Sequence, residues 1–382
     1  MEDRFVERKQ SFKTIDTQSL TRRREAAKKE SEDSKRELLK SLRESLSEQL
    51  FAEKTSGQEI QTRRLFAKTF MYPDTLISIP ENLGVDWLVG LRPEGQRCLA
   101  ILVGNSLTLR QRNGQIIDTF VLDPFSVRRS DNIAMFDAIY GFNNQNLKRT
   151  LYIADVVMMK GNELVFSDFS FRQYYLGEHW PFLPSVSAPM LMDSETSVPD
   201  IVKLEYLSAS SDNINRLYQE GLPTVTPDSL LFCLKDGKYV NGLTQEVLSF
   251  RDSNLSRYAI DTTQEDGFDG SESMEIVLRV VRGPKKIFLF KTWDGIVLHQ
   301  SETVPEWIVS VLKRKPFVLV RCIVSNKFEF SEMKSSGKPF AMSLNRIVDQ
   351  FRKRRETLKL DPIGNDMFDA PPVSISDILS LS

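Results

Sequence analysis

The sequence predicts an α+β protein with a β-rich body, and three observations lead to this fold class. Short apolar runs separated by turn residues dominate from about residue 66 onward, as in QRCLAILVG and PFVLVRCIVSN, and this pattern is typical of strands. Two-residue turn signals, Asn113-Gly114 and Asp236-Gly237, indicate hairpins between such runs. Residues 1–53 are instead charged, free of Gly and Pro, and rich in helix formers.

These elements fall into four parts along the chain. A helical segment occupies residues 1–53, and a β-rich domain occupies residues 66–260. The stretch DTTQEDGFDGSESM, which is acidic and contains Gly and Ser, predicts a junction that begins at residue 261. A smaller β domain then covers residues 261–360 and ends in the amphipathic helix SLNRIVDQFRKRRETLKL, and residues 361–382 form a tail.

The composition excludes several classes of protein. Lys and Arg number 51 against 52 Asp and Glu, so the net charge of −1 creates no overall attraction to nucleic acid, and any such contact needs a local site. Three scattered cysteines and two histidines indicate a reducing compartment and no metal site. We also expect no cofactor. The sequence has no signal peptide and no apolar run of membrane-spanning length, so no membrane contact is expected.

The N-terminal segment carries a basic cluster in an unusual place. Thr21 is a plausible helix N-cap, and Arg22, Arg23 and Arg24 follow it directly, although the helix dipole favours acidic residues there. That local cost indicates a cluster kept for a partner. A leucine stripe that begins at Leu38 gives the same segment a narrow apolar face. We expect the segment to become ordered on binding.

Three stretches of the β-rich region carry the residue types that a nucleotide site needs, namely aromatic faces for a base and cations for phosphates. They are RPEGQR at 92–97, MFDAIYGFNNQNLKRTLYIADVVMMKG at 135–161, and DSLLFCLKDGKYVNGLTQEVLSFRDSNLSRYAID at 228–261. In this order they resemble the motifs of the GTP:RNA guanylyltransferase (capping enzyme) family, across residues 70–350. The resemblance implies a nucleotidyltransferase-like domain followed by an OB-like β domain.

The sequence departs from that family at residues that the family's nucleotide-transfer reaction requires. Arg92 stands where the family has its nucleophilic lysine, and a guanidinium does not deprotonate near neutral pH. Residues 137–139 read Asp-Ala-Ile instead of Asp-Gly-Glu, and residues 249–251 read Ser-Phe-Arg instead of Lys-Trp-Lys. No lysine lies between Lys68 and Lys148 to replace the nucleophile. These losses predict a protein that binds a nucleotide without transferring it.

The chain also resembles the snurportin family, whose cap-binding domain is a guanylyltransferase-like fold without the chemistry. LISIPENLGVDWLVGLRPEGQRCLAIL at 76–102 is similar to the family's P-x-x-LG-x-x-W lead-in, and LYIADVVMMKGNELVFSDFSFRQYYL at 151–176 is similar to its YY-x-LDV…DF-x-FR-x-Y run. The N-terminal segment resembles an importin-β-binding segment. The residues that carry this second resemblance are Arg4, Phe5, Lys9, Phe12, Lys13, Arg22, Arg23, Arg24, Lys35 and Arg36.

This resemblance implies a non-catalytic import adaptor. Such a protein binds the trimethylguanosine cap of spliceosomal small nuclear RNA particles, links them to importin-β, and shuttles between cytoplasm and nucleus. An exportin that recycles it is a further partner of the family, but the start MEDRFVE has little of the apolar character that this contact uses. Two alternatives stay open, an active capping guanylyltransferase and a catalytically dead relative that serves as a protein-binding scaffold.

The resemblance also implies which residues contact the cap. Phe250 would stack on the methylated guanine, Trp87 and Leu83 would lie near the base, and cations would meet the phosphates. The full set is Leu83, Trp87, Arg92, Arg97, Lys160, Phe250 and Arg251. Each has a structural alternative: core packing for the apolar residues, ion pairs for the arginines, and a place on the surface for the lysine.

Overall fold

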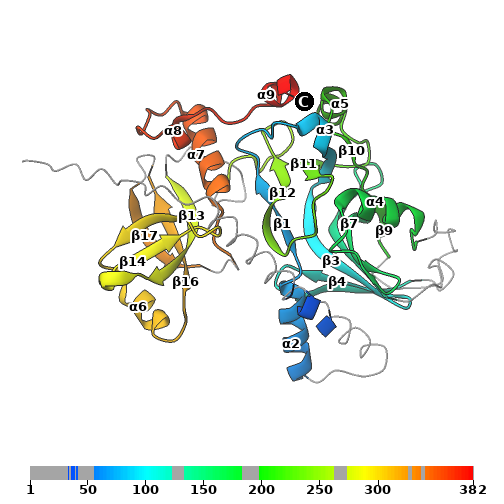
Figure 1. Ribbon diagram of the computed structural model, residues 1–382, viewed down its shortest axis with the longest axis horizontal. Helices are drawn as coiled ribbons and strands as arrows, with labels where there is room; N and C mark the ends of the chain where they lie inside the picture. Colours follow the sequence, from blue (N-terminus) through cyan, green and yellow to red (C-terminus); the bar gives the residue numbers. More distant parts are fainter. Residues whose placement is uncertain are drawn as a thin grey trace, which may run out of the picture. The chain divides into compact units, whose positions relative to one another are not determined.

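The structure is a computed structural model (Figure 1), and its contacts divide the chain into two units, residues 1–55 and residues 56–382. The described residues are 33, 36–38, 40–41, 56–122, 133–182, 198–261, 273–325, 329–336 and 340–381. In the first unit the described residues are helical, and Arg36 forms an exposed ion pair with Asp33 at 3.4 Å. The other importin-β-binding residues named above lie outside the described residues, so their role stays a prediction.

The second unit begins with a helix and contains a five-stranded sheet built from distant parts of the chain. Its strand order is β1-β12-β11-β2-β10, in which β1 and β12 run parallel and the other pairs run antiparallel. The strands are β1 (Met71–Thr75), β2 (Trp87–Pro93), β10 (Leu207–Ser208), β11 (Pro227–Leu234) and β12 (Gly242–Phe250), and the neighbouring helices are α2 (Ser56–Ala67), α3 (Leu83–Asp86) and α5 (Ser211–Gln219).

A second sheet of seven strands follows the order β5-β4-β3-β6-β7-β8, with β9 parallel to β7. Its strands are β3 (Gly95–Val103), β4 (Ser106–Gln111), β5 (Ile116–Val121), β6 (Ile133–Phe142), β7 (Arg149–Met159), β8 (Asn162–Glu163) and β9 (Asp200–Lys203). Helix α4 (Phe169–Glu178) packs against β7 (Figure 1). The strands β6 and β7 are buried along almost their whole length, which explains their continuous apolar sequence.

The hairpin between β4 and β5 confirms the turn predicted from Asn113-Gly114. Gly114 has φ +78, where a residue with a side chain is strained, and a Cβ there would lie 1.8 Å from the Arg63 carbonyl oxygen. The Arg63 guanidinium also donates to the carbonyl of Asn113 at 3.2 Å. Only glycine therefore fits this turn against α2.

A third sheet has five antiparallel strands in the order β15-β14-β13-β16-β17 and encloses its own core. Its elements are β13 (Met274–Arg282), the 3-10 turn η1 (Pro284–Lys286), β14 (Phe288–Lys291), β15 (Val297–Ser301), α6 (Glu306–Leu312), β16 (Val318–Val324) and β17 (Phe330–Ser335). Five antiparallel strands are consistent with an OB-like domain. The α+β fold class is confirmed, whereas the domain boundaries stay predictions.

Three helices follow the third sheet: α7 (Leu344–Leu358), α8 (Asp366–Asp369) and α9 (Ile375–Leu381). Ser343 caps α7 by accepting from the Arg346 backbone N–H, and its hydroxyl donates to Asp74 of β1 at 3.0 Å. Asn345 adds a second bond to the same carboxylate at 2.8 Å. Helix α9 inserts Ile378, which is fully buried, into the core of the first sheet. The C-terminal helices therefore contact the first sheet at two places.

Candidate functional site

Three of the predicted cations meet at one small cavity. Arg92 comes from β2, Arg97 comes from β3, and Arg251 directly follows β12; all three line a cavity of about 130 Å³. The exposed Arg112 and Arg346 also border it. The sheet pairing brings these residues together, since Arg92 lies opposite Ser229 of β11 and β11 pairs with the end of β12. We call this space the arginine cavity.

One buried carboxylate holds two of these guanidinium groups. Asp228 forms an ion pair with Arg92, and it accepts a hydrogen bond from Arg251 at 2.6 Å. The Arg251 Nε also donates to the Asp228 backbone carbonyl at 3.1 Å, and Ser256 donates to its carboxylate at 2.9 Å. Asp228 therefore orients both arginines without matching their combined charge.

A second carboxylate holds Arg97. The guanidinium of Arg97 binds Asp137 through two bonds of 2.8 and 2.5 Å, and the hydroxyl of Tyr239 donates to the same carboxylate at 2.8 Å. Asp137 is only 1% exposed. The burial of Tyr239 itself, followed by the negative charge of Asp137, raises the pKa of Tyr239 well above its usual value. The carboxylate that survives from the resembled metal motif is thus engaged within the protein.

The charges around the arginine cavity do not balance. Arg92, Arg97 and Arg251 share the two carboxylates of Asp137 and Asp228. Arg112 adds another positive charge and makes no ion pair with any residue that the structure describes; its guanidinium lies 5.3 Å from the ring of Tyr72. Burial, followed by repulsion from the Arg251, Arg97 and Arg112 guanidinium groups, lowers the pKa of Arg92. This excess of positive charge favours an anionic ligand.

An aromatic cavity of about 400 Å³ adjoins the arginine cavity and shares five lining residues with it: Pro73, Thr75, Arg112, Asp261 and Arg346. Three aromatic rings form its wall. The Tyr72 and Trp293 centroids lie 5.8 Å apart, Tyr72 and Phe340 5.1 Å, and Trp293 and Phe340 4.3 Å. Burial raises the pKa of Tyr72 to about 12, so its hydroxyl stays protonated. An aromatic surface therefore lies directly beside the cluster of cations.

Sequence reasoning did not identify the aromatic wall. Tyr72 comes from β1, Trp293 from the turn between β14 and β15, and Phe340 from the segment before α7, so no local spacing connects them. The turn sequence TWDG was the available signal for Trp293, because a tryptophan in a turn is more exposed than one in a strand. Arg112 and Arg346 were missed for the same reason, since they belong to no motif.

The apolar members of the predicted cap site lie in a different place. Leu83, Trp87 and Phe250 are 0%, 8% and 3% exposed and pack together in the core of the first sheet. None of them lines the arginine cavity or the aromatic cavity. Side chains alternate along β12, so Ser249 faces the arginine cavity while Phe250 enters the core. Their surroundings are those of packing residues, and their contact with a cap stays a prediction.

Lys160 is also separate from the arginine cavity. It occupies the turn between β7 and β8 with φ +53, and its Nζ lies 3.2 Å from Nδ1 of His179 at the end of α4. It lines neither of the two cavities described above. The structure thus brings together Arg92, Arg97 and Arg251 of the seven predicted cap-site residues, and it leaves Lys160 apart from them.

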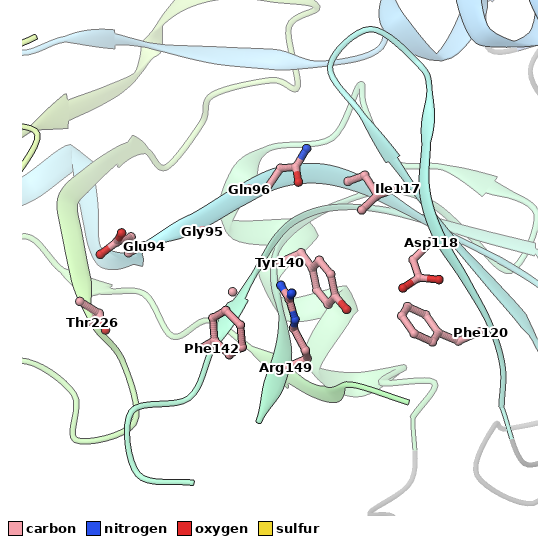
Figure 2. Close-up of a pocket in the computed structure, with 11 residues that line it drawn as sticks. Glu94, Gly95, Gln96, Ile117, Asp118, Phe120, Tyr140, Phe142, Arg149 and Thr226 are labelled. Carbon is pink, nitrogen blue, oxygen red and sulfur yellow. The ribbon is translucent and has the colours of Figure 1, made fainter. Parts of the chain in front are cut away.

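A larger cavity of about 740 Å³ lies along β3, β5 and β6 (Figure 2). Figure 2 shows the Arg149 guanidinium beside the rings of Phe142 and Tyr140, whose centroids lie 4.3 and 5.3 Å from its central carbon. The carboxylates of Glu94 and Asp118 also line the cavity. One cation against two carboxylates suits a polyphosphate poorly, so size alone does not make this cavity the better candidate.

Across the described ranges, no group of three or more His, Cys, Asp or Glu side chains is placed to hold a metal ion. Within the same ranges, none of the helices combines the length and the hydropathy needed to span a membrane.

Solved structures similar to this chain include several DNA ligases. One, from a structure–function analysis of Lig E DNA ligases, has 11% identity and a TM-score of 0.30, covering 70% of this chain and 99% of that one. The ligase domain of M. tuberculosis LigD has 8% identity and a TM-score of 0.32, with 72% and 91% covered. Chlorella virus DNA ligase-adenylate has 11% identity and a TM-score of 0.31, with 71% and 100% covered. Similarity at this level carries no information about activity.

A family model gives the more specific match. Residues 69–251 match the family described as Snurportin1, m3G cap-binding domain. The matched region contains Tyr72, Arg92, Arg97, Arg112 and Arg251, whereas Trp293, Phe340 and Arg346 lie beyond it. Residues 69–251 of this chain are therefore similar to the snurportin m3G cap-binding domain.

Proposed function

We propose that this protein binds the methylated 5′ cap of RNA and does not chemically change it. The observation that carries the proposal is the excess of guanidinium groups over carboxylates in the arginine cavity, which lies largely within the region similar to the snurportin domain. A cap contains a triphosphate bridge, and arginine binds phosphate oxygens through paired N–H donors. Arg92, Arg112 and Arg251 would hold this bridge.

The same residues argue against nucleotide transfer. Arg92 occupies the position of the resembled nucleophile, and a guanidinium paired with Asp228 does not become a free amine. Two further buried aspartates that line a small cavity together with Arg92 are also engaged: Asp137 binds Arg97 and Tyr239, and Asp155 binds Arg172 through bonds of 2.9 and 2.8 Å. An incubation with radiolabelled GTP should therefore leave no label on the protein, and a covalent guanylate would instead establish the capping-enzyme alternative.

The finer function that we propose is that of an import adaptor. The ligand would be the trimethylguanosine cap of spliceosomal small nuclear RNA particles, and the basic segment within residues 1–53 would bind importin-β, so the protein would shuttle between cytoplasm and nucleus. Supporting this are the snurportin-family match and the resemblance of the N-terminal segment to an importin-β-binding segment. Recycling by an exportin is a further expectation from the resemblance. A protein-binding scaffold is the remaining alternative.

Fluorescence titration of the full chain with trimethylguanosine and monomethylguanosine cap dinucleotides tests the ligand. We expect tighter binding of the trimethyl cap. We also expect Arg112→Ala to weaken binding about tenfold, the loss expected for one charged hydrogen bond. Because Arg112 is exposed and makes no described ion pair, this variant should keep the wild-type melting temperature. Arg314→Ala, an exposed arginine outside both cavities, is the control. No binding by the wild type, or equal binding of the two caps, would overturn the proposal.

Importin-β binding needs a separate experiment. Replacing Arg22, Arg23 and Arg24 together by Ala should abolish capture of purified importin-β by the full chain, because the acidic inner face of a helical-repeat receptor would lose its partner charges. Replacing Arg257, Lys313 and Arg314, which are exposed cations of the second unit, is the matched control for charge. Equal capture by both triple variants would show that the N-terminal cluster is not the binding element.

A further inference from the structure

We infer that the methylated base of the cap stacks on the aromatic wall formed by Tyr72, Trp293 and Phe340. The C-terminal β module, by which we mean the third sheet and the segment that leads from it to α7, would then supply the base-binding half of the site. This inference rests on the proposed cap-binding function and adds a base-binding half to the phosphate-binding half of the site. The snurportin-family match ends at residue 251, before two of the three rings. The cap-binding domain alone would therefore hold the phosphates and lack most of this wall.

The aromatic wall lies where a base attached to the bound phosphates can reach it. The aromatic cavity and the arginine cavity share five lining residues, and one of these is Pro73, the chain neighbour of Tyr72. The Tyr72 centroid is 5.3 Å from the guanidinium of Arg112 and 6.0 Å from that of Arg97. A ligand with its phosphates among the arginines would therefore place an attached nucleoside beside the aromatic rings.

Backbone hydrogen bonds fix Trp293 in its place. Its N–H donates to the Met342 carbonyl at 2.9 Å, and the Met342 N–H donates to Val277 of β13 at 2.8 Å. The turn that carries it is closed by the Thr292 N–H, which donates to the Ile296 carbonyl at 2.9 Å. The indole is only partly buried. A ring held by its backbone and open on one side provides a stacking surface at low entropic cost.

One carboxylate and one hydroxyl of the aromatic cavity are already engaged, whereas the buried Tyr72 hydroxyl has no hydrogen-bond partner among the described residues. Asp261, the one carboxylate on its lining, accepts two bonds of 2.7 and 2.9 Å from Nη2 of Arg346 and one of 3.0 Å from its Nε. The hydroxyl of Ser343 donates to Asp74. An unmethylated guanine amino group would thus find no free carboxylate to accept its hydrogen bonds, whereas an N2-dimethylated one has no donor to satisfy.

The charge of the ligand favours the same arrangement. A guanine methylated at N7 carries a positive charge, and such a cation is attracted to the faces of Trp, Tyr and Phe rings. Its negative triphosphate would lie on the opposite side, among the arginines. The two adjoining cavities therefore match the two ends of a methylated cap, and an unmethylated guanine nucleotide would match only the arginine cavity.

The test compares four forms of the full chain with two ligands. The proteins are the wild type, Trp293→Ala, Trp293→Phe and the control Phe317→Ala, which removes an exposed aromatic ring of the same module outside both cavities. The ligands are the trimethylguanosine cap dinucleotide and its unmethylated GpppG analogue. Trp293→Ala should weaken trimethyl-cap binding by about ten- to a hundredfold, the range for loss of one stacked aromatic ring. It should weaken GpppG binding by less than about threefold, because that ligand would be held through its phosphates, whose contacts the variant keeps.

Trp293→Phe keeps a ring face and should recover most of the affinity, while Phe317→Ala should match the wild type. Ligand quenching of tryptophan fluorescence gives an independent readout, because Trp293→Phe should bind the cap with much less quenching. Unchanged trimethyl-cap affinity in Trp293→Ala, or an equal loss for both ligands, would overturn the inference while wild-type binding upholds the proposed function. A wild type that does not bind the cap would overturn both.

Discussion

Asp228 accepts a hydrogen bond from Arg251 and is also ion-paired with Arg92, so one buried carboxylate orients two guanidinium groups at the arginine cavity. This sharing leaves one positive charge without an equal counter-charge before any ligand arrives. In an internal salt bridge the positive and negative charges are equal. Because they are unequal here, the arrangement favours the binding of an anion.

The first prediction concerns this shared carboxylate. Asp228→Asn should lower the stability by about 3–5 kcal/mol, because two partly buried guanidinium groups lose their counter-charge. It should also increase the rise in melting temperature that tripolyphosphate produces, since the anion then replaces the missing charge. Thermal melts with and without tripolyphosphate measure both effects. A smaller rise than in the wild type would show that the arginines do not hold phosphate.

The second prediction concerns the buried network of Arg97, Asp137 and Tyr239. Arg97→Ala should cost about 3–5 kcal/mol, because it leaves a fully buried carboxylate without its cation. Tyr239→Phe removes one hydrogen bond to the same carboxylate and should cost only about 1–3 kcal/mol. Urea unfolding of both variants gives the comparison. Equal costs would mean that Asp137 does not depend on Arg97 for its charge balance.

The third prediction separates packing from stacking at Phe250. Because its ring is buried in the core of the first sheet and lines neither cavity, Phe250→Ala should cost about 3–5 kcal/mol of stability. The folded variant should bind the trimethyl cap with wild-type affinity. Urea unfolding together with cap titration at low temperature tests this. A large loss of cap affinity with unchanged stability would instead support the stacking role predicted from the resemblance.

The fourth prediction concerns the three cysteines and pH. Burial raises the pKa of Cys98, Cys233 and Cys322, so in the folded protein the thiols stay protonated and should react with a thiol reagent at pH 8 only after unfolding. The thiols of the unfolded chain have a pKa of about 8.5. Since the folded pKa values are higher, the thiol contribution to stability is complete below that value and is lost as the pH rises above it.

Thiol labelling of native and urea-unfolded protein at pH 8 provides the first measurement, and urea unfolding between pH 7 and 10 provides the second. Rapid labelling of a native cysteine would contradict the burial on which the prediction depends. Unfolding free energies that rise with pH over this range would show that other groups outweigh the thiols.

The sequence was sufficient to predict those features of the structure that depend on short stretches of the chain. The Asn113-Gly114 turn needed only its two residues, because the glycine is forced by the close approach of Arg63. The meeting of Arg92, Arg97 and Arg251 followed from the order of the motifs, since strands that carry such motifs converge in the fold they resemble. In both cases the residues that carry the information are near one another in sequence or within one known motif.

Other features depend on register and on distant contacts, which short stretches do not specify. The motif predicted that Phe250 and Arg251 would lie together in the site. Adjacent side chains of a strand point to opposite faces of the sheet, however, and Phe250 is buried in the core. The aromatic wall needs residues 72, 293 and 340 to meet, and three separate segments bring them together. Nothing in the local chemistry of Trp293 distinguishes it from a tryptophan of an ordinary turn.

The burial of Ile378 in the core of the first sheet has a consequence for how the protein is made. The other buried members of that core lie between Leu76 and Leu255, so the ribosome synthesises the third sheet before it reaches the residue that completes the first one. Until then, the nascent core exposes apolar surface at the place that α9 later covers. This interval is when a chaperone would have an exposed surface to bind, and it makes the core of the first sheet the last to close during translation.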